Sequence, residues 1–138
     1  MKSKKRRVPK KNAGMYGYTI VEGQDVEPSQ FKIKNLEYIS ALQKGESGIN
    51  GETLRQRAVA LRANFGLADG MRILKHQDEI PKKMREHIVL AGTLLRDADG
   101  QLVVAILYWD YFGIWRMSFL PLSNTWTRHC LPRIKGAH

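Results

Sequence analysis

The residues of this chain that could do chemistry lie mostly at its two ends, and the chemistry they favour is anion binding. The first twelve residues hold seven basic side chains and no acidic one. These are Lys2, Lys4, Lys5, Arg6, Arg7, Lys10 and Lys11. Such a segment has little apolar surface to bury, but it releases condensed counterions when it meets a row of phosphates. The pattern predicts a disordered basic arm over residues 1–14 that binds nucleic acid, either DNA or RNA.

A second, weaker cationic segment covers residues 123–138. It contains Arg128, Arg133 and Lys135 and no acidic residue. Trp126 lies in the same polar stretch, where an exposed indole could stack on an unpaired base. We therefore expect a basic C-terminal tail whose cations contact phosphates while Trp126 stacks. Phosphate contacts carry no base information, so sequence-specific recognition is not predicted.

The formal net charge of +10 belongs to these two ends. The chain has 23 Lys and Arg against 13 Asp and Glu. The ends hold ten of the basic residues, so the 13 that remain in residues 13–122 balance the 13 acidic residues, which all lie there. A neutral body with cationic ends favours a protein whose folded part positions those ends or recruits another protein.

Residue types that bind metals gather in one segment, at His76, Asp78, Glu79 and His87. Their spacing is not that of the helical His-Glu-x-x-His zinc site, and Pro81 interrupts any helix that would align them. A solvated polar loop explains them better. The sequence predicts neither a metal nor a cofactor.

Two further sites could support catalysis, but each has a simpler explanation. Cys130 follows His129, yet adjacent residues of an extended chain point to opposite sides, so they form no dyad by themselves. Asp110 follows an apolar run and would need a partner such as Arg116 if it were buried. A small enzyme with a pocket near Asp110 stays an alternative, while the sequence as a whole favours a non-enzymatic protein.

Apolar periodicity predicts two or three helices in the first half of the chain. The first follows Asn35 and stops at Gly45, the second runs from about Glu52 to Phe65, and the third starts at Asp69 or Gly70 and ends before Pro81. Gly66 separates the last two, as in a helix-turn-helix, although Arg72 and Lys75 fall where apolar anchors should lie. Alternation at Tyr16, Tyr18 and Ile20 is typical of a short strand before these helices.

Three apolar runs in the second half of the chain predict an antiparallel three-stranded meander. They cover residues 88–95, 101–109 and 114–120 and are separated by turn-forming residues. The predicted fold is a single α+β domain over residues 15–122, with two to three N-terminal helices packed on this C-terminal meander and with flexible basic ends. The strands are apolar on both sides, so both faces need a cover, and the cover of the second face stays open.

Aromatic residues concentrate between residues 108 and 126, which supports a different function. Tyr, Trp and Arg dominate binding hot spots, so the alternative is a protein–protein adaptor or inhibitor that docks through the aromatic sheet.

A membrane span is not predicted, because Asp110, Arg116 and Pro121 interrupt the best apolar window. A single cysteine and the lack of a secretory pattern favour a cytoplasmic location, or a nuclear one in a eukaryote.

Overall fold

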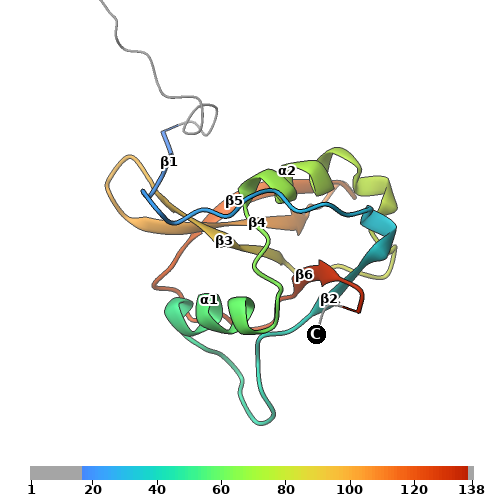
Figure 1. The fold of residues 1–138 in the computed structure, drawn as a ribbon, viewed down its shortest axis with the longest axis horizontal. Helices are drawn as coiled ribbons and strands as arrows, with labels where there is room; N and C mark the ends of the chain where they lie inside the picture. The colour runs from blue at the N-terminus through green and yellow to red at the C-terminus, as the bar shows by residue number, and fades with distance from the viewer. Residues whose placement is uncertain (1–16, 137–138) are drawn as a thin grey trace, which may run out of the picture.

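The computed structural model describes residues 17–136, which form two antiparallel sheets and two α-helices (Figure 1). Along the chain these elements are β1 (Thr19–Ile20), β2 (Leu36–Ile39), α1 (Gly51–Ala60), α2 (Leu67–Lys75), β3 (Ile88–Arg96), β4 (Leu102–Trp109), β5 (Trp115–Pro121) and β6 (Leu131–Ile134), with short 3-10 turns at Ile33–Asn35 and Gln77–Glu79. The first sheet has the strand order β1-β3-β4-β5, and the second pairs β2 with β6. Neither described helix has the length and apolarity that a bilayer crossing requires.

The predicted fold class, helices packed on a C-terminal three-stranded meander with flexible ends, is wrong. The first sheet is a four-stranded half-barrel, because β1 pairs with the far end of β3. The segment after Asn35 is not a helix but strand β2. Leu36 and Ile39 fit a short apolar run of either kind, and the pairing of β2 with β6 decides for the strand. The described fold is therefore mostly β, with strands both before and after the helices.

The four-stranded sheet separates two hydrophobic cores, and each core is covered by one helix. Alternate residues of β4 point to opposite faces: Val104 and Ile106 enter one core, whereas Ala105 and Leu107 enter the other. Helices α1 and α2 lie on opposite sides of this sheet (Figure 1). This arrangement explains why the strands are apolar on both sides, and it excludes a helix-turn-helix formed by α1 and α2.

Residues 123–136, predicted as a flexible tail, belong to the fold. Strand β6 pairs with β2 over four residue pairs, and Cys130 forms an isolated bridge to the start of β3. Trp126 and Leu131 are buried in the core beneath α1. The prediction of a flexible C-terminal end is therefore wrong, whereas the basic arm over residues 1–14 lies outside the described residues.

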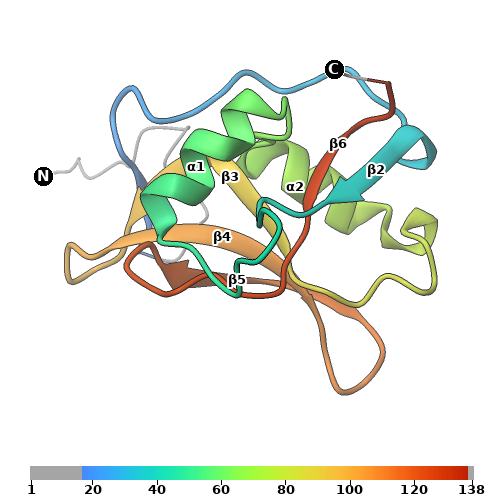
Figure 2. The same ribbon diagram turned by 90° about the horizontal axis from the view of Figure 1, so that it is seen from below.

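The two ends of the four-stranded sheet are well separated. At one end Gly17 lies beside Ala98 of the β3–β4 turn, so the segment that follows the basic arm enters the fold there. At the opposite end the β4–β5 loop projects away from the sheet (Figure 2). Strand β4 is eight residues long, which sets these two ends about 25 Å apart at the usual rise of a strand.

Candidate functional site

Seven of the predicted contact residues lie outside the described part of the chain. They are Lys2, Lys4, Lys5, Arg6, Arg7, Lys10 and Lys11. The other four, Trp126, Arg128, Arg133 and Lys135, are described, and the structure does not bring them together into one binding surface.

Trp126 is part of the core rather than an exposed ring. Its side chain is 4% exposed, and its indole Nε1 donates a hydrogen bond to the Leu122 carbonyl at 3.3 Å. Its backbone N–H and carbonyl both bond to Ile49, which fixes the segment against the loop before α1. The ring therefore lacks the free face that stacking on a base requires, and the expectation of an exposed Trp126 is not met.

The C-terminal cations have different surroundings. Arg133 is half-buried, because its guanidinium donates to Glu37 at 2.6 Å and to the Leu61 carbonyl at 3.0 Å. Arg128 is exposed but pairs with Glu86 at 2.9 Å. Lys135 is exposed. Only Arg128 and Lys135 are accessible to an external anion, and Arg128 already has a carboxylate beside it.

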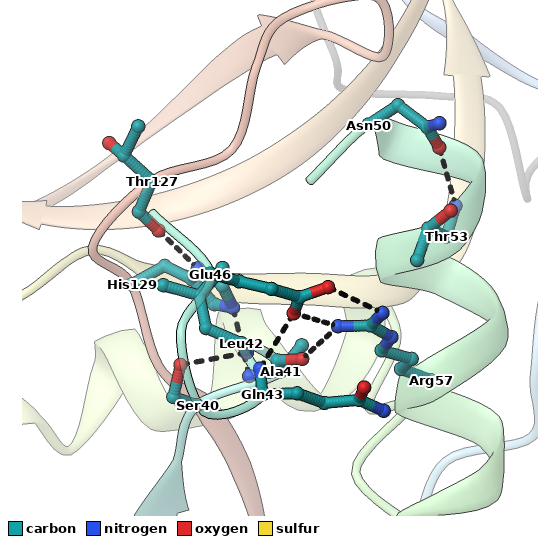
Figure 3. Close-up of polar contacts among 10 residues, drawn as sticks. All are labelled: Ser40, Ala41, Leu42, Gln43, Glu46, Asn50, Thr53, Arg57, Thr127 and His129. Atoms are coloured by element: carbon teal, nitrogen blue, oxygen red, sulfur yellow. Dashed lines mark hydrogen bonds and ion pairs between the residues drawn. The ribbon is translucent and has the colours of Figure 1, made fainter. Parts of the chain in front are cut away.

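A connected set of polar contacts fastens the loop between β2 and α1, and we call it the His129 cluster (Ala41, Glu46, Arg57, Thr127 and His129; Figure 3). The buried His129 ring donates from Nδ1 to the Thr127 carbonyl at 2.5 Å and accepts at Nε2 from the Ala41 N–H at 3.2 Å. Burial lowers the pKa of His129, so the neutral ring is favoured. Both ring nitrogens are thus used within the fold.

Arg57 of α1 completes this cluster. Its guanidinium donates to the two carboxylate oxygens of Glu46 at 2.5 and 3.0 Å and to the Ala41 carbonyl at 2.9 Å. The Arg57 hydrogen bond, helped by the Gln43 N–H, lowers the pKa of Glu46 to about 2. The polar groups of the His129 cluster are committed to one another, so this region is better suited to holding a loop than to binding a ligand.

The β4–β5 loop is built by Asp110, which the sequence had marked as a possible catalytic acid. Its Oδ1 accepts from the Phe112 and Ile114 N–H groups at 2.8 and 3.0 Å, and its Oδ2 pairs with Arg116. These contacts, the Ile114 bond above all, hold the pKa of Asp110 below its usual value. The expected partner Arg116 is confirmed, and the carboxylate serves as a turn-builder rather than as an acid with a raised pKa.

Two aromatic rings at the tip of this loop point into solvent. Tyr111 is 96% exposed and Phe112 is 78% exposed, and their rings meet edge to face at 5.5 Å. The Asp110 contacts and the positive φ of Gly113 hold the loop in a tight turn. Apolar rings displayed on an ordered loop are typical of a binding surface. Neither residue was predicted as a contact from the sequence, although two aromatic residues between the turn formers Asp110 and Gly113 were a usable signal.

A basic groove lies beside the loop. The Arg85 guanidinium lies over the Trp109 ring at 3.8 Å, and Trp109 in turn meets Trp115 at 5.7 Å. Arg85 forms no ion pair with any described residue. Lys82 lines the same groove and is likewise exposed without an ion pair among residues 17–136. We call Lys82, Arg85, Tyr111 and Phe112 the hairpin surface.

Metal and thiol chemistry find no support in the described part of the chain. Residues 17–136 contain no group of three or more His, Cys, Asp or Glu side chains placed to hold a metal ion. Cys130 is 3% exposed, and burial raises the pKa of its thiol well above its usual value. A buried protonated thiol is a poor nucleophile.

Comparison with known protein families, with curated proteins and with solved structures finds no match to this chain.

Proposed function

We propose that the protein binds nucleic acid through the hairpin surface and the basic arm, and that it does so without catalysing a reaction. The observation that carries this proposal is an exposed cation, held in place without a carboxylate partner, that lies next to exposed rings. Arg85 is braced on an indole next to the loop that displays Tyr111 and Phe112. Aromatic rings that contact bases, next to cations that contact phosphates, are the recurring composition of nucleic-acid grooves.

The contact with Trp109 matters because it lowers the entropy that the Arg85 side chain loses when a ligand binds. The planar guanidinium is already held in one orientation, so little rotamer entropy is lost when it meets a phosphate or a base. It also has no carboxylate to release, in contrast to Arg128, which would have to leave Glu86. The Arg85 guanidinium is thus better prepared for an anion than that of Arg128.

The charge distribution supports a polyanionic partner. The seven basic residues of the arm leave 16 of the 23 Lys and Arg for residues 17–136, against all 13 acidic residues, so the described part keeps a net charge of +3. The arm adds seven further charges and precedes Gly17, which lies at the opposite end of the sheet. A nucleic acid that reaches from the hairpin surface to Gly17 would span about 25 Å, or roughly seven or eight nucleotides at the rise of a B-form strand.

A protein partner is the second candidate function. Tyr111, Phe112 and Ile114 are all exposed apolar side chains on one loop, which would also suit the centre of a protein interface. The cations beside them favour the nucleic acid. The two candidates differ in their response to salt, because only phosphate neutralisation releases a large number of counterions.

The test is the affinity of the full chain for a labelled oligonucleotide of about 20 nucleotides, measured by fluorescence anisotropy at about 50 and about 200 mM salt. We expect a steep decrease in affinity with salt. Replacing the seven basic residues of the arm with Gln should reduce the slope of log K against log salt by up to about 5 to 6. No binding at the lower salt concentration would refute the proposal and leave the protein partner as the better candidate.

A further inference from the structure

We propose that the groove beside Arg85 accommodates an unpaired base that carries an exocyclic amino group, which makes the protein selective for single-stranded nucleic acid. This inference rests on the proposed function and specifies the class of ligand. It is carried by three properties of the groove: its rigid wall, its stacking surface and its unused acceptor.

The groove is small and firmly built. Its volume is about 290 Å³, close to the lower limit for small-ligand pockets and suited to a single planar ring system. It is lined by Gln77, Asp78, Ile80, Lys82, Arg85, Trp109, Gly113 and Trp115. The amide of Gln77 donates to the Trp115 carbonyl at 3.2 Å and accepts from the Trp115 N–H at 2.8 Å. These bonds tie the segment after α2 to the free edge of β5, so the wall is already formed before a ligand binds.

Arg85 supplies the stacking surface. One face of its guanidinium is covered by the Trp109 indole, while the residue lines the groove and is exposed. The second face is therefore available to a planar ring, and guanidinium planes are a common platform for unstacked bases. The order indole, guanidinium, base would continue a stack that the fold has already begun.

Asp78 supplies the unused acceptor. It lines the same groove, is exposed, and forms no hydrogen bond or ion pair with any described residue. A carboxylate accepts from the exocyclic amino groups of cytosine, adenine or guanine, whereas thymine has no exocyclic amino group and offers only its ring N3–H. Its negative charge disfavours a phosphate at that point, so a base edge is the better occupant. Lys82, on the same lining, is placed for the phosphate.

Duplex nucleic acid cannot present a base in this way. In a double helix both faces of each base are stacked and its Watson–Crick edge is paired, so entry of a base into the groove would require unstacking and unpairing. The rings of Tyr111 and Phe112 beside the groove suit further unstacked bases of the same strand.

The test compares three labelled probes of about 20 nucleotides: oligo(dC), oligo(dT) and a duplex of mixed sequence. The variants are Arg85→Ala and Asp78→Asn in the full chain. Arg72→Ala is the matched control for the first, since Arg72 is also an arginine held over a ring, that of Phe31 at 4.6 Å, but does not line the groove. Glu79→Gln is the control for the second, because it removes a neighbouring charge outside the groove lining.

We expect the unmodified chain to bind oligo(dC) about 5- to 10-fold more tightly than oligo(dT), which corresponds to one good polar contact. Arg85→Ala should weaken oligo(dC) binding by about 5- to 100-fold, the range of one stacked base, with a much smaller effect on the duplex. Asp78→Asn should bring the dC-to-dT ratio towards one, because an amide can donate as well as accept. Glu79→Gln should leave that ratio unchanged.

Equal effects of Arg85→Ala and Arg72→Ala on every probe, or a dC-to-dT ratio of one in the unmodified chain, would overturn this inference. If neutralising the arm still weakened binding in that case, the proposed function would stand without the base site. If none of the probes bound at about 50 mM salt, both proposals would fall together.

Discussion

The His129 cluster and the hairpin surface are both rich in polar and charged groups, but they use them in opposite ways. In the His129 cluster both imidazole nitrogens have a partner, and the Arg57 guanidinium is shared between Glu46 and a backbone carbonyl. In the hairpin surface the cation of Arg85 lies on a ring and has no carboxylate beside it. The loop tip of that surface exposes two rings, whereas the cluster encloses its imidazole.

This difference separates side chains that build the fold from side chains that are left for a partner. Burying a polar group is costly unless it is hydrogen-bonded, so a fully bonded cluster indicates a structural role. Exposed rings and an exposed cation that has no carboxylate partner add little to the stability of the fold, and so they indicate a ligand. The predictions below test that distinction, from the largest expected effect to the smallest.

Trp126→Ala should destabilise the protein by about 3–5 kcal/mol, because it removes a large buried side chain from the core beneath α1. Urea unfolding followed by circular dichroism measures the change. The affinity of the folded fraction for a single-stranded oligonucleotide should not change. A loss of affinity with unchanged stability would instead make Trp126 a contact residue. It would contradict the distinction between side chains that build the fold and side chains that bind a partner.

The double variant Tyr111→Ser, Phe112→Ser should have the opposite profile. Stacking on bases is worth about 1–3 kcal/mol for each ring, so oligonucleotide affinity should fall by at least that amount. The free energy of unfolding should stay within about 0.5 kcal/mol of the parent, because both side chains are exposed. Val59→Ser is the matched control, since Val59 is 61% exposed on α1, away from the hairpin surface. Equal binding by the double variant and the control would remove the rings from the interface.

The stability of the protein should fall as the pH decreases below the usual histidine pKa of 6.5. Burial lowers the pKa of His129 in the folded state, so the unfolded chain binds the proton more readily and acid favours unfolding. The loss should begin near pH 6.5, whereas the contribution of Glu46, whose pKa falls from 4.5 to about 2, should persist until the pH drops below 4.5.

Unfolding free energies of the parent and of His129→Gln, measured between about pH 5 and pH 7.5, check this result. The Gln amide can accept from the Ala41 N–H without titrating, so its curve should be flatter across that range. Identical pH profiles for the two proteins would mean that protonation of His129 does not cause the loss of stability below pH 6.5.

Tyr38→Phe should be neutral or should stabilise the protein by up to about 1 kcal/mol. Among the described residues, the Tyr38 hydroxyl is the one buried side-chain polar atom without a hydrogen-bond partner, and burial raises the pKa of Tyr38 to about 12. Removing the hydroxyl relieves an unpaired polar group. A clear loss of stability in thermal unfolding would show that the Tyr38 hydroxyl has a hydrogen-bond partner, as the other buried polar side chains of the described residues do.

Much of the strand pattern could be predicted from the sequence, and the fold class could not. The three apolar runs match β3, β4 and β5 to within one residue at each end, because such runs bounded by turn formers are a local signal. The pairings of β1 with β3 and of β2 with β6 join segments that are far apart in the chain. Leu36 and Ile39 suit a helix as well as a strand, and only the remote partner β6 decides between them.

The candidate site shows the same limit. Trp126 has polar neighbours in the sequence, and only the fold shows that its ring turns into the core. Arg85 is one of several cations in its segment, and its bracing depends on Trp109, which lies 24 positions later in the chain. The exposure of Tyr111 and Phe112 could have been predicted from the sequence, because a turn between two apolar strands leaves its central side chains in water.

Amide chemical-shift mapping of the full chain during titration with a single-stranded oligonucleotide of about 20 nucleotides tests the central claim most directly. One spectrum reports on both regions at once. We expect the largest shifts in residues 78–85 and 110–114, with residues 40–50 and 126–130 unchanged. Shifts that centre on the His129 cluster, with the hairpin surface unmoved, would contradict the account.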